Sequence, residues 1–224
     1  MRKRLRDVRR HDDEGFSLIE LLVSMIVFTI AISMIYAVVN LVQTKTSKVE
    51  SSAEAVSQLR QGLADIDRQV RSGNVLYAPG NEAVGVDSTI GCTTPLADPN
   101  SGSCMRIFTQ VDGIARCVQW QLLGDSNRPG TAQLRSRFWT PKWQTMPLGA
   151  VSGWRVVARG LAASPSKAAF TLAGGGVYGA RLLEVHLEAV DPRRSTPIII
   201  TSSLAGRNTN YGYDAGQCTP VPPS

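Results

Sequence analysis

Few residues in this chain have the type and spacing that enzyme chemistry requires. The chain has two histidines, His11 and His186, and we expect His186 to be an ordinary surface residue on the polar side of an alternating segment. The glycine-rich segment AGGGVYG at 173–179 lacks the Lys-Ser/Thr pair of a phosphate-binding loop and therefore predicts a turn. A metal site would need further His or closely spaced Cys ligands. The sequence therefore predicts no catalysis, no metal and no cofactor.

The four cysteines have spacings that predict disulfides rather than a metal or redox site. They are Cys92, Cys104, Cys117 and Cys218, with separations of 12, 13 and 101 residues and no Cys-x-x-Cys pair. If this part of the chain lies outside the cytoplasm, two disulfides are expected. We favour Cys92–Cys104, which would close a loop rich in Pro, Gly, Asn and Ser, and Cys117–Cys218, which would hold the C-terminal tail. Free or partly paired thiols are the alternative.

The charge distribution does not favour a nucleic-acid surface. The net charge is +6, and the first fifteen residues hold six Arg or Lys against four acidic residues, which leaves +4 for the other 209 residues. The basic residues of that larger part are scattered among apolar ones and form no stripe. Nucleic acid is therefore not the favoured partner, although the sequence leaves it open. The four tryptophans could mark a sugar- or partner-binding patch, but tryptophans within strand-like runs are more often core residues.

The residue that most needs an explanation is Glu20. It is the only charged residue between Phe16 and Val42, a run of 27 residues without proline or glycine. As a helix this run would measure about 40 Å at about 1.5 Å per residue, which exceeds the ~30 Å hydrocarbon core of a bilayer. A carboxylate in that core costs about 2.5–3.5 kcal/mol. The run is thus a membrane helix, or is built like one, with a costly residue near its start.

The flanks of this run give its expected orientation. Basic residues precede it, so the positive-inside tendency places the N-terminus in the cytoplasm and the rest of the chain outside. A secretory signal peptide has an apolar region of only about 7–15 residues followed by a small-residue cleavage site. Here the run is longer and continues into a polar, helical sequence. We therefore do not expect signal peptidase to cleave after it.

The helical pattern continues beyond the apolar run. One apolar stripe recurs at helical spacing, formed by Val49, Ala53, Val56, Leu63, Ile66 and Val70. We predict one helix over residues 16–71, apolar all round in its first half and ended by a glycine stop at 72–74. A coiled coil is the alternative, weakened by the short length of the stripe and by Gly62. The stripe needs a packing partner.

Residues 75–224 predict a β-rich domain. Turn formers separate six strand-like segments, at 105–111, 115–123, 133–140, 153–160, 180–190 and 197–204. The last two would form an antiparallel hairpin, and residues 180–190 alternate in the manner of a strand with one wet face. An antiparallel sheet must bury one face, and the helix stripe supplies the matching surface. The predicted class is α+β, with an antiparallel sheet on the second half of a long N-terminal helix and a loose tail, CTPVPPS.

The segment GFSLIELLVSM at 15–25 closely resembles the processing site of type IV prepilins and of the pseudopilins of type II secretion. The resemblance implies cleavage by prepilin peptidase between Gly15 and Phe16, N-methylation of Phe16, and an assembly role for Glu20. It also implies contacts with other pilin or pseudopilin subunits through the N-terminal helix, after a stage in the cytoplasmic membrane. The expected organisation is a leader at 1–15, a transmembrane and filament-core helix at 16–42, an amphipathic continuation at 43–73 and an extracytoplasmic domain at 74–224.

Within this family the chain looks most like a minor pilin or a J-type pseudopilin. SLAGRNTN at 203–210 resembles the C-terminal end of those proteins, the body is larger than that of many major pilins, and no proline occurs near Ala37. The expected function is that of a minor subunit of a type IV pilus, in initiation, at the tip, or in adhesion, motility or DNA uptake. The alternatives are a pseudopilin of a type II secretion system and an uncleaved, membrane-anchored binding or sensor domain.

Cleavage would give Glu20 a partner. Removal of the leader frees an α-amino group on Phe16, with a reference pKa of about 8. In a filament of staggered helices, Glu20 of one subunit could approach the ammonium group of another and set the register. In an uncleaved anchor, Glu20 would simply reach the lipid headgroups. We therefore expect a Glu20→Ala variant to insert and be processed but not to enter filaments.

Overall fold

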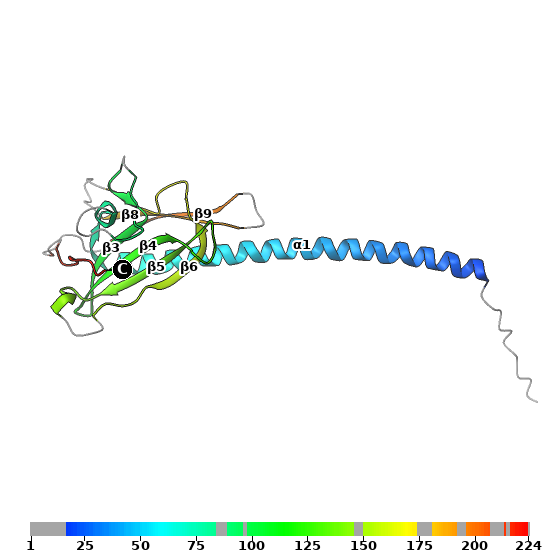
Figure 1. The fold of residues 1–224 in the computed structure, drawn as a ribbon, viewed down its shortest axis with the longest axis horizontal. Helices are drawn as coiled ribbons and strands as arrows, with labels where there is room; N and C mark the ends of the chain where they lie inside the picture. The colour runs from blue at the N-terminus through cyan, green and yellow to red at the C-terminus, as the bar shows by residue number, and fades with distance from the viewer. Residues whose placement is uncertain are drawn as a thin grey trace, which may run out of the picture. The chain divides into compact units, whose positions relative to one another are not determined.

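The computed structural model describes residues 17–83, 89–95, 98–145, 150–173, 181–191, 196–206, 213 and 216–223 (Figure 1). The chain divides into two compact units, Met1–Ser47 and Lys48–Ser224. One helix, α1, extends from Leu18 to Arg71 and contributes residues to both units. The predicted helix is therefore present, although Phe16 lies outside the described residues.

The second unit adds a β-sheet to the end of α1. All six predicted strands occur, and every strand begins and ends within two residues of its expected bounds. Three short strands and two short helical turns were not predicted. In chain order the elements are β1 (Gly73–Tyr77), α2 (Gly80–Ala83), β2 (Ser101–Gly102), β3 (Cys104–Val111), β4 (Ile114–Gly124), β5 (Thr131–Trp139), the 3-10 turn η1 (Trp143–Thr145), β6 (Arg155–Ala162), β7 (Phe170–Ala173), β8 (Leu182–Ala189) and β9 (Ile198–Ala205).

The strands form one antiparallel sheet in the order β1-β3-β4-β5-β6-β8-β7-β2, with β9 paired to β8. β6 and β8 meet at a single pair, Leu161 and Ala189. β8 and β9 pair along all eight residues without a register shift, which confirms the predicted hairpin. Its connection at 192–195 lies outside the described residues.

The C-terminal part of the predicted stripe packs against this sheet, through Leu63, Ile66 and Val70. Val49 and Ala53 at its start are exposed, and Leu59, which the prediction did not include, is buried instead. Leu59, Ile66 and Val70 are fully buried in one hydrophobic cluster with Trp120, Leu134 and other inward-facing strand residues. Burying such side chains contributes roughly 1.5–3 kcal/mol each. The arrangement is the predicted α+β class, a long N-terminal helix packed on an antiparallel sheet in the manner of a pilin.

The helix ends where expected, but not through a left-handed glycine. α1 stops at Arg71, and Gly73 already belongs to β1 without a positive φ. A Cβ at Gly73 would lie 2.9 Å from Ile107 Cγ2 and 3.0 Å from the carbonyl oxygen of Val70. The glycine is therefore required by the close approach of β3 and the helix end.

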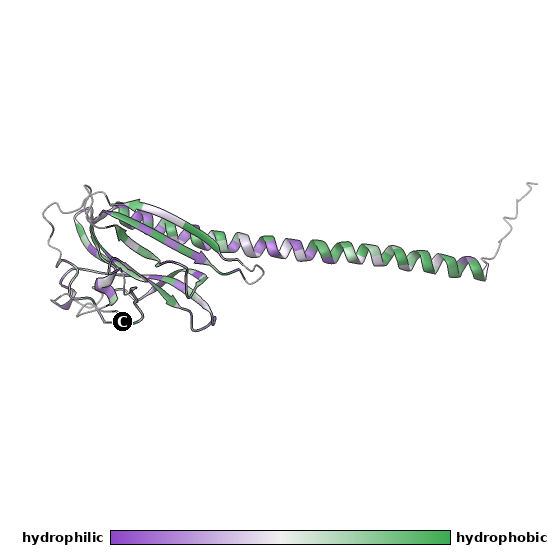
Figure 2. Cartoon of the chain, turned by 90° about the horizontal axis from the view of Figure 1, so that it is seen from above, coloured by the Kyte–Doolittle hydropathy of each residue, from purple (hydrophilic) through white to green (hydrophobic). Residues whose placement is uncertain are grey.

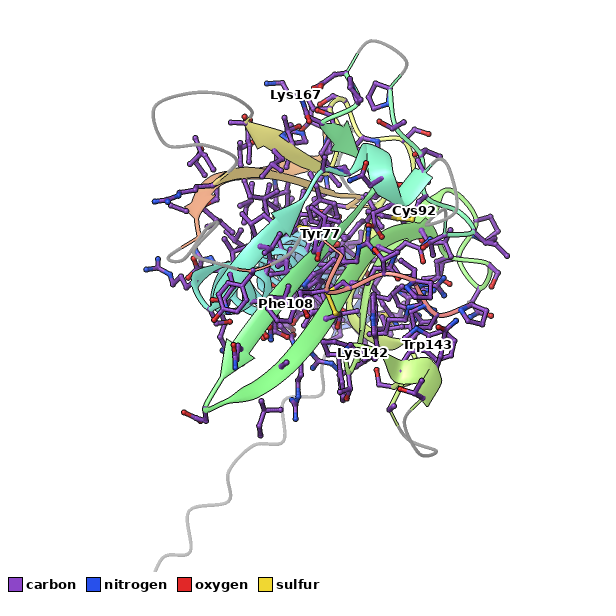
Figure 3. All side chains as sticks on the ribbon, turned by 90° about the vertical axis from the view of Figure 1, so that its left-hand side faces the viewer. Tyr77, Cys92, Phe108, Lys142, Trp143 and Lys167 are labelled. Atoms are coloured by element: carbon purple, nitrogen blue, oxygen red, sulfur yellow. A yellow bond between two sulfur atoms is a disulfide. The ribbon has the colours of Figure 1, made fainter. Side chains whose placement is uncertain are left out.

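The opposite face of the sheet carries a second, smaller core. Tyr77, Phe108, Cys117, Trp139 and Cys218 form this cluster, and Tyr77 and Phe108 are labelled in Figure 3. The two disulfides are Cys92–Cys104 and Cys117–Cys218, which are the pairings that the sequence favours.

The C-terminal tail is held against this second face, so the prediction of a loose tail is wrong. The guanidinium of Arg137 donates to the carbonyl oxygens of Pro222 (2.7 Å) and Pro223 (2.8 Å). Burial lowers the pKa of Arg137 to about 10, while the charge of Glu82 acts in the opposite direction. Arginine donors that satisfy proline carbonyls thus keep the tail in place, together with the disulfide at its start.

His186 is buried, so its predicted surface position is also wrong. Its Nδ1 lies 2.9 Å from Thr201 Oγ1, and its Nε2 lies 2.9 Å from Glu188 Oε1. The backbone N–H of Ser166 donates to the same Glu188 oxygen at 2.6 Å. Burial acts to raise the pKa of Glu188, but the hydrogen bonds from Ser166 and His186 lower it overall. The segment before β7, which contains Ser166, therefore covers the face of β8 that was expected to be exposed to solvent.

Candidate processing and assembly site

The described part of the predicted site begins at the first turn of α1. The carbonyl oxygen of Ser17 accepts hydrogen bonds from the backbone N–H groups of Glu20 (3.0 Å) and Leu21 (3.1 Å). Glu20 therefore lies in the first helical turn, where the helix dipole favours a negative charge. Gly15 and Phe16, the predicted cleavage and methylation residues, lie outside the described residues.

The helix that follows is apolar on every side. All residues from 17 to 46 are exposed, and the large apolar side chains between Leu18 and Val42 keep 44–84% of their surface accessible. Figure 2 shows the N-terminal stretch of α1 mostly in the hydrophobic colour, whereas hydrophilic and hydrophobic turns alternate further along the helix. The helix is long and apolar enough to cross a membrane. An apolar surface of this size needs lipid or other apolar helices around it.

The serine and threonine hydroxyl groups between Leu18 and Val42 donate to the backbone of the helix itself. Ser24 Oγ donates to the carbonyl oxygen of Glu20 (2.7 Å), and Thr29 Oγ1 donates to that of Met25 (2.6 Å). Because these side chains donate to the helix backbone, their hydroxyl groups need no water. The sequence analysis did not single out these residues. A serine or threonine inside a predicted helix could have suggested a hydrogen bond from its hydroxyl to the carbonyl oxygen four residues earlier.

Glu20 is the exception in this surface. Within the described part of the chain, its carboxylate has no hydrogen-bond or ion-pair partner from another residue. The described residues also contain no group of three or more His, Cys, Asp or Glu that could hold a metal ion. The first turn of α1 therefore presents one carboxylate without a partner among the described residues, at the end of an apolar helix.

The comparison with known families places this region. A model described as the prokaryotic N-terminal methylation motif matches residues 10–36, which include Gly15, Phe16 and Glu20. No curated protein and no solved structure matches the chain. The matched residues include the start of the uncovered apolar helix, and in the sequence they precede a domain with a pilin-like α+β fold. The chain carries the N-terminal methylation motif of type IV prepilin-like proteins, a family that is generally structural rather than enzymatic.

Proposed function

We propose that this chain is a minor subunit of a type IV pilus or a related envelope filament. It is cleaved between Gly15 and Phe16 by prepilin peptidase, methylated on Phe16, and held in the membrane by α1 before assembly. The N-terminus lies in the cytoplasm at that stage, and residues 74–224 lie outside it. The observation that carries the proposal is the methylation motif at 10–36 at the start of a helix whose apolar surface is uncovered on every side.

In this proposal Glu20 recognises the new N-terminus of a neighbouring subunit. Cleavage creates an ammonium group on Phe16, four residues before Glu20 in the sequence. Both charges are costly in an apolar helix bundle, and pairing them between staggered subunits offsets part of that cost. A single charge pair in an otherwise featureless apolar surface also defines one axial offset. The carboxylate thus acts as a register device for assembly.

The first test is the N-terminus of the mature protein. The full chain is extracted from membranes and from sheared surface filaments, and its first residue is identified by mass spectrometry. We expect a mature chain that begins at methylated Phe16, and a Met1 start in a strain without prepilin peptidase. A Met1 start in the unmodified strain would identify an uncleaved membrane-anchored domain instead.

The second test separates the charge of Glu20 from its processing. We expect Glu20→Ala and Glu20→Gln to insert in the membrane and to be cleaved, but to be absent from the filament fraction. Glu50→Ala is the matched control, because Glu50 is an exposed glutamate of the same helix beyond the apolar run. Normal filament incorporation of both Glu20 variants would refute the register role.

A pseudopilin of type II secretion would carry the same motif and would give the same mature N-terminus. A deletion strain distinguishes the two systems. Loss of surface pili with normal protein export supports the pilus, whereas loss of exported proteins with normal pili assigns the chain to secretion.

A further inference from the structure

The last strand of the sheet, β9, has one side that no described segment covers. β9 pairs with β8 along its whole length, and no other strand in the described part of the chain pairs with it. Its residues Ile199, Thr201, Ser203 and Ala205 are exposed, whereas Ile198 and Ile200 pack against the core. Among the described residues, β9 is therefore an edge strand that is paired with β8 on one side, unpaired on the other, and packed on the core through Ile198 and Ile200.

The hydrogen-bond pattern shows which backbone groups of β9 face outward. Gly206 N donates to the carbonyl oxygen of Arg181, its partner in the β8–β9 register. In an antiparallel pair, alternate residues direct both backbone groups to the same neighbour. The even-numbered residues of β9 thus face β8, and the odd-numbered residues direct their N–H and C=O groups away from it. The backbone N–H of His186, which donates to the carbonyl oxygen of Ala169 on the other side of β8, fits the same alternation.

The other edges of the sheet are protected in ways that β9 is not. β1 has five residues and a register shift between Gly73 and Val75, and β2 has only two residues. Where β6 diverges from β8, the N–H of Arg159 donates to Gln58 Oε1 of α1 (3.1 Å). By contrast, β9 has eight residues with no charge, no proline and no register shift. Short length, bulges, charges and prolines are the usual defences against unwanted strand pairing, and β9 has none of them.

We propose that β9 accepts an extended strand from the neighbouring subunit of the filament, which adds to the sheet edge at Ile199, Thr201, Ser203 and Ala205. This inference rests on the proposed filament function. Strand addition of this kind gains affinity from main-chain hydrogen bonds and needs no charge complementarity, in agreement with the uncharged edge.

The small interface area that one added strand would bury favours a partner that is already tethered close to β9. A stable complex between free proteins buries about 1,200–2,000 Å², which is more than one added strand of this length supplies. A partner tethered through a second contact has a high effective concentration and needs much less. The uncovered apolar helix at residues 18–42 provides that second contact when subunits assemble. The occupant is therefore another subunit that carries the same kind of N-terminal helix, and not a freely diffusing protein.

Ser203 offers a direct test, because its N–H faces outward and its side chain is exposed. Ser203→Pro removes that N–H while every N–H that faces β8 remains, and proline is tolerated at such edge positions. Ser203→Thr keeps the N–H and is the matched control. In the full chain, we expect both variants to be processed at Phe16 and to unfold at the same denaturant concentration. Because one hydrogen bond and the space for a neighbouring strand are lost, we expect about tenfold less Ser203→Pro in the filament fraction.

Equal amounts of the two variants in filaments would overturn the inference while leaving the proposed function intact. Absence of the unmodified chain from filaments would overturn both. If Ser203→Pro unfolds earlier than Ser203→Thr, a photo-crosslinking amino acid at Ser203 decides the matter in the otherwise unchanged chain. A crosslink to a strand of another chain with the methylation motif supports the inference. A crosslink only to the same chain or to a soluble protein, or no crosslink, refutes it.

Discussion

Residues 18–47 and residues 48–71 belong to one helix, but they differ in how their apolar side chains are distributed around the helix and in how far these side chains are buried. In the first segment the apolar residues cover the whole circumference and all of them are exposed. In the second segment the apolar residues recur on one face, and between Leu59 and Val70 that face is buried under the sheet, whereas Val49 stays exposed. Helical backbone alone therefore does not decide what a helix contacts.

The difference lies in what each segment needs from its surroundings. A helix with one apolar stripe is complete once a single surface covers the stripe. A helix that is apolar all round must be enclosed on every side, by lipid or by other helices. The second segment thus stabilises the folded domain, whereas under the proposed function the first exchanges lipid for neighbouring subunits. Matched substitutions in the two segments should separate these roles.

The largest difference in the free energy of unfolding is expected from truncating an isoleucine to alanine in each segment. Ile66 is fully buried under the sheet, and Ile66→Ala should lower the free energy of unfolding by about 2–5 kcal/mol. Ile26→Ala, in the exposed segment, should leave it unchanged. All four tryptophans lie between residues 120 and 154, so fluorescence during denaturation in detergent reports on the β-rich unit alone. Equal effects of the two variants would contradict the comparison.

A smaller contrast is expected from replacing one small residue in each segment, Gly62 or Ala31, by leucine. A Cβ at Gly62 would lie 2.9 Å from Leu134 Cδ2, because the sheet approaches the helix closely there. Gly62→Leu should therefore cost about 1–3 kcal/mol through overpacking. Ala31→Leu, at an exposed position of the first segment, should not change the same denaturation curve. A stabilised Gly62→Leu would show that the core has room which the structure does not indicate.

The same comparison explains what sequence reasoning could predict. The long helix and the six main strands follow from local periodicity, so their existence was predicted and is confirmed. The two disulfide pairs agree with the favoured pairings because each closes a segment rich in turn formers or ties down a tail. The motif residues Gly15 and Phe16 were read from eleven consecutive residues, and they stay predictions because they lie outside the described part of the chain.

The features that sequence reasoning missed all depend on contacts between distant residues. β2 and β7 are strands because they pair with each other and with β8, and neither has a periodicity of its own. His186 is buried because Ser166 and its segment cover β8, twenty residues away in the chain. The tail is ordered because Arg137, eighty-five residues earlier, donates to its carbonyl oxygen. Such long-range partners leave no local pattern to read.

Hydroxyl groups provide a third contrast between the two segments of α1. Ser51 and Ser52 donate to the two carboxylate oxygens of Asp191, at 2.6 and 2.8 Å, and Asp191 is almost fully buried. Ser52→Ala removes one of these donors and should lower the free energy of unfolding by about 1 kcal/mol. Ser33→Ala removes a bond to the helix's own backbone, at 2.8 Å, and should have no effect on the β-rich unit. An equal loss in both variants would contradict this contrast, because alanine favours the helix more than serine does and helix propensity alone would give no loss.

The smallest effect is expected on the exposed face of the second segment, where the helix ends. Arg71 Nε donates to both carboxylate oxygens of Asp67, at 2.8 and 2.7 Å, in an i,i+4 pair with the acidic residue first. Such pairs contribute about 0.2–0.5 kcal/mol, and the position of Arg71 in the last turn also suits the helix dipole.

Arg71→Ala should therefore lower the free energy of unfolding by less than about 1 kcal/mol, and high salt should reduce the difference because the pair is exposed. Arg60→Ala is the control, since Arg60 is exposed in the same segment but precedes the last turn. A loss as large as that of Ile66→Ala would mean that the polar face of this segment holds the helix to the domain as firmly as the buried stripe does. A loss confined to a few tenths of a kcal/mol, and absent in high salt, would locate the stabilising contacts of α1 in the stripe alone.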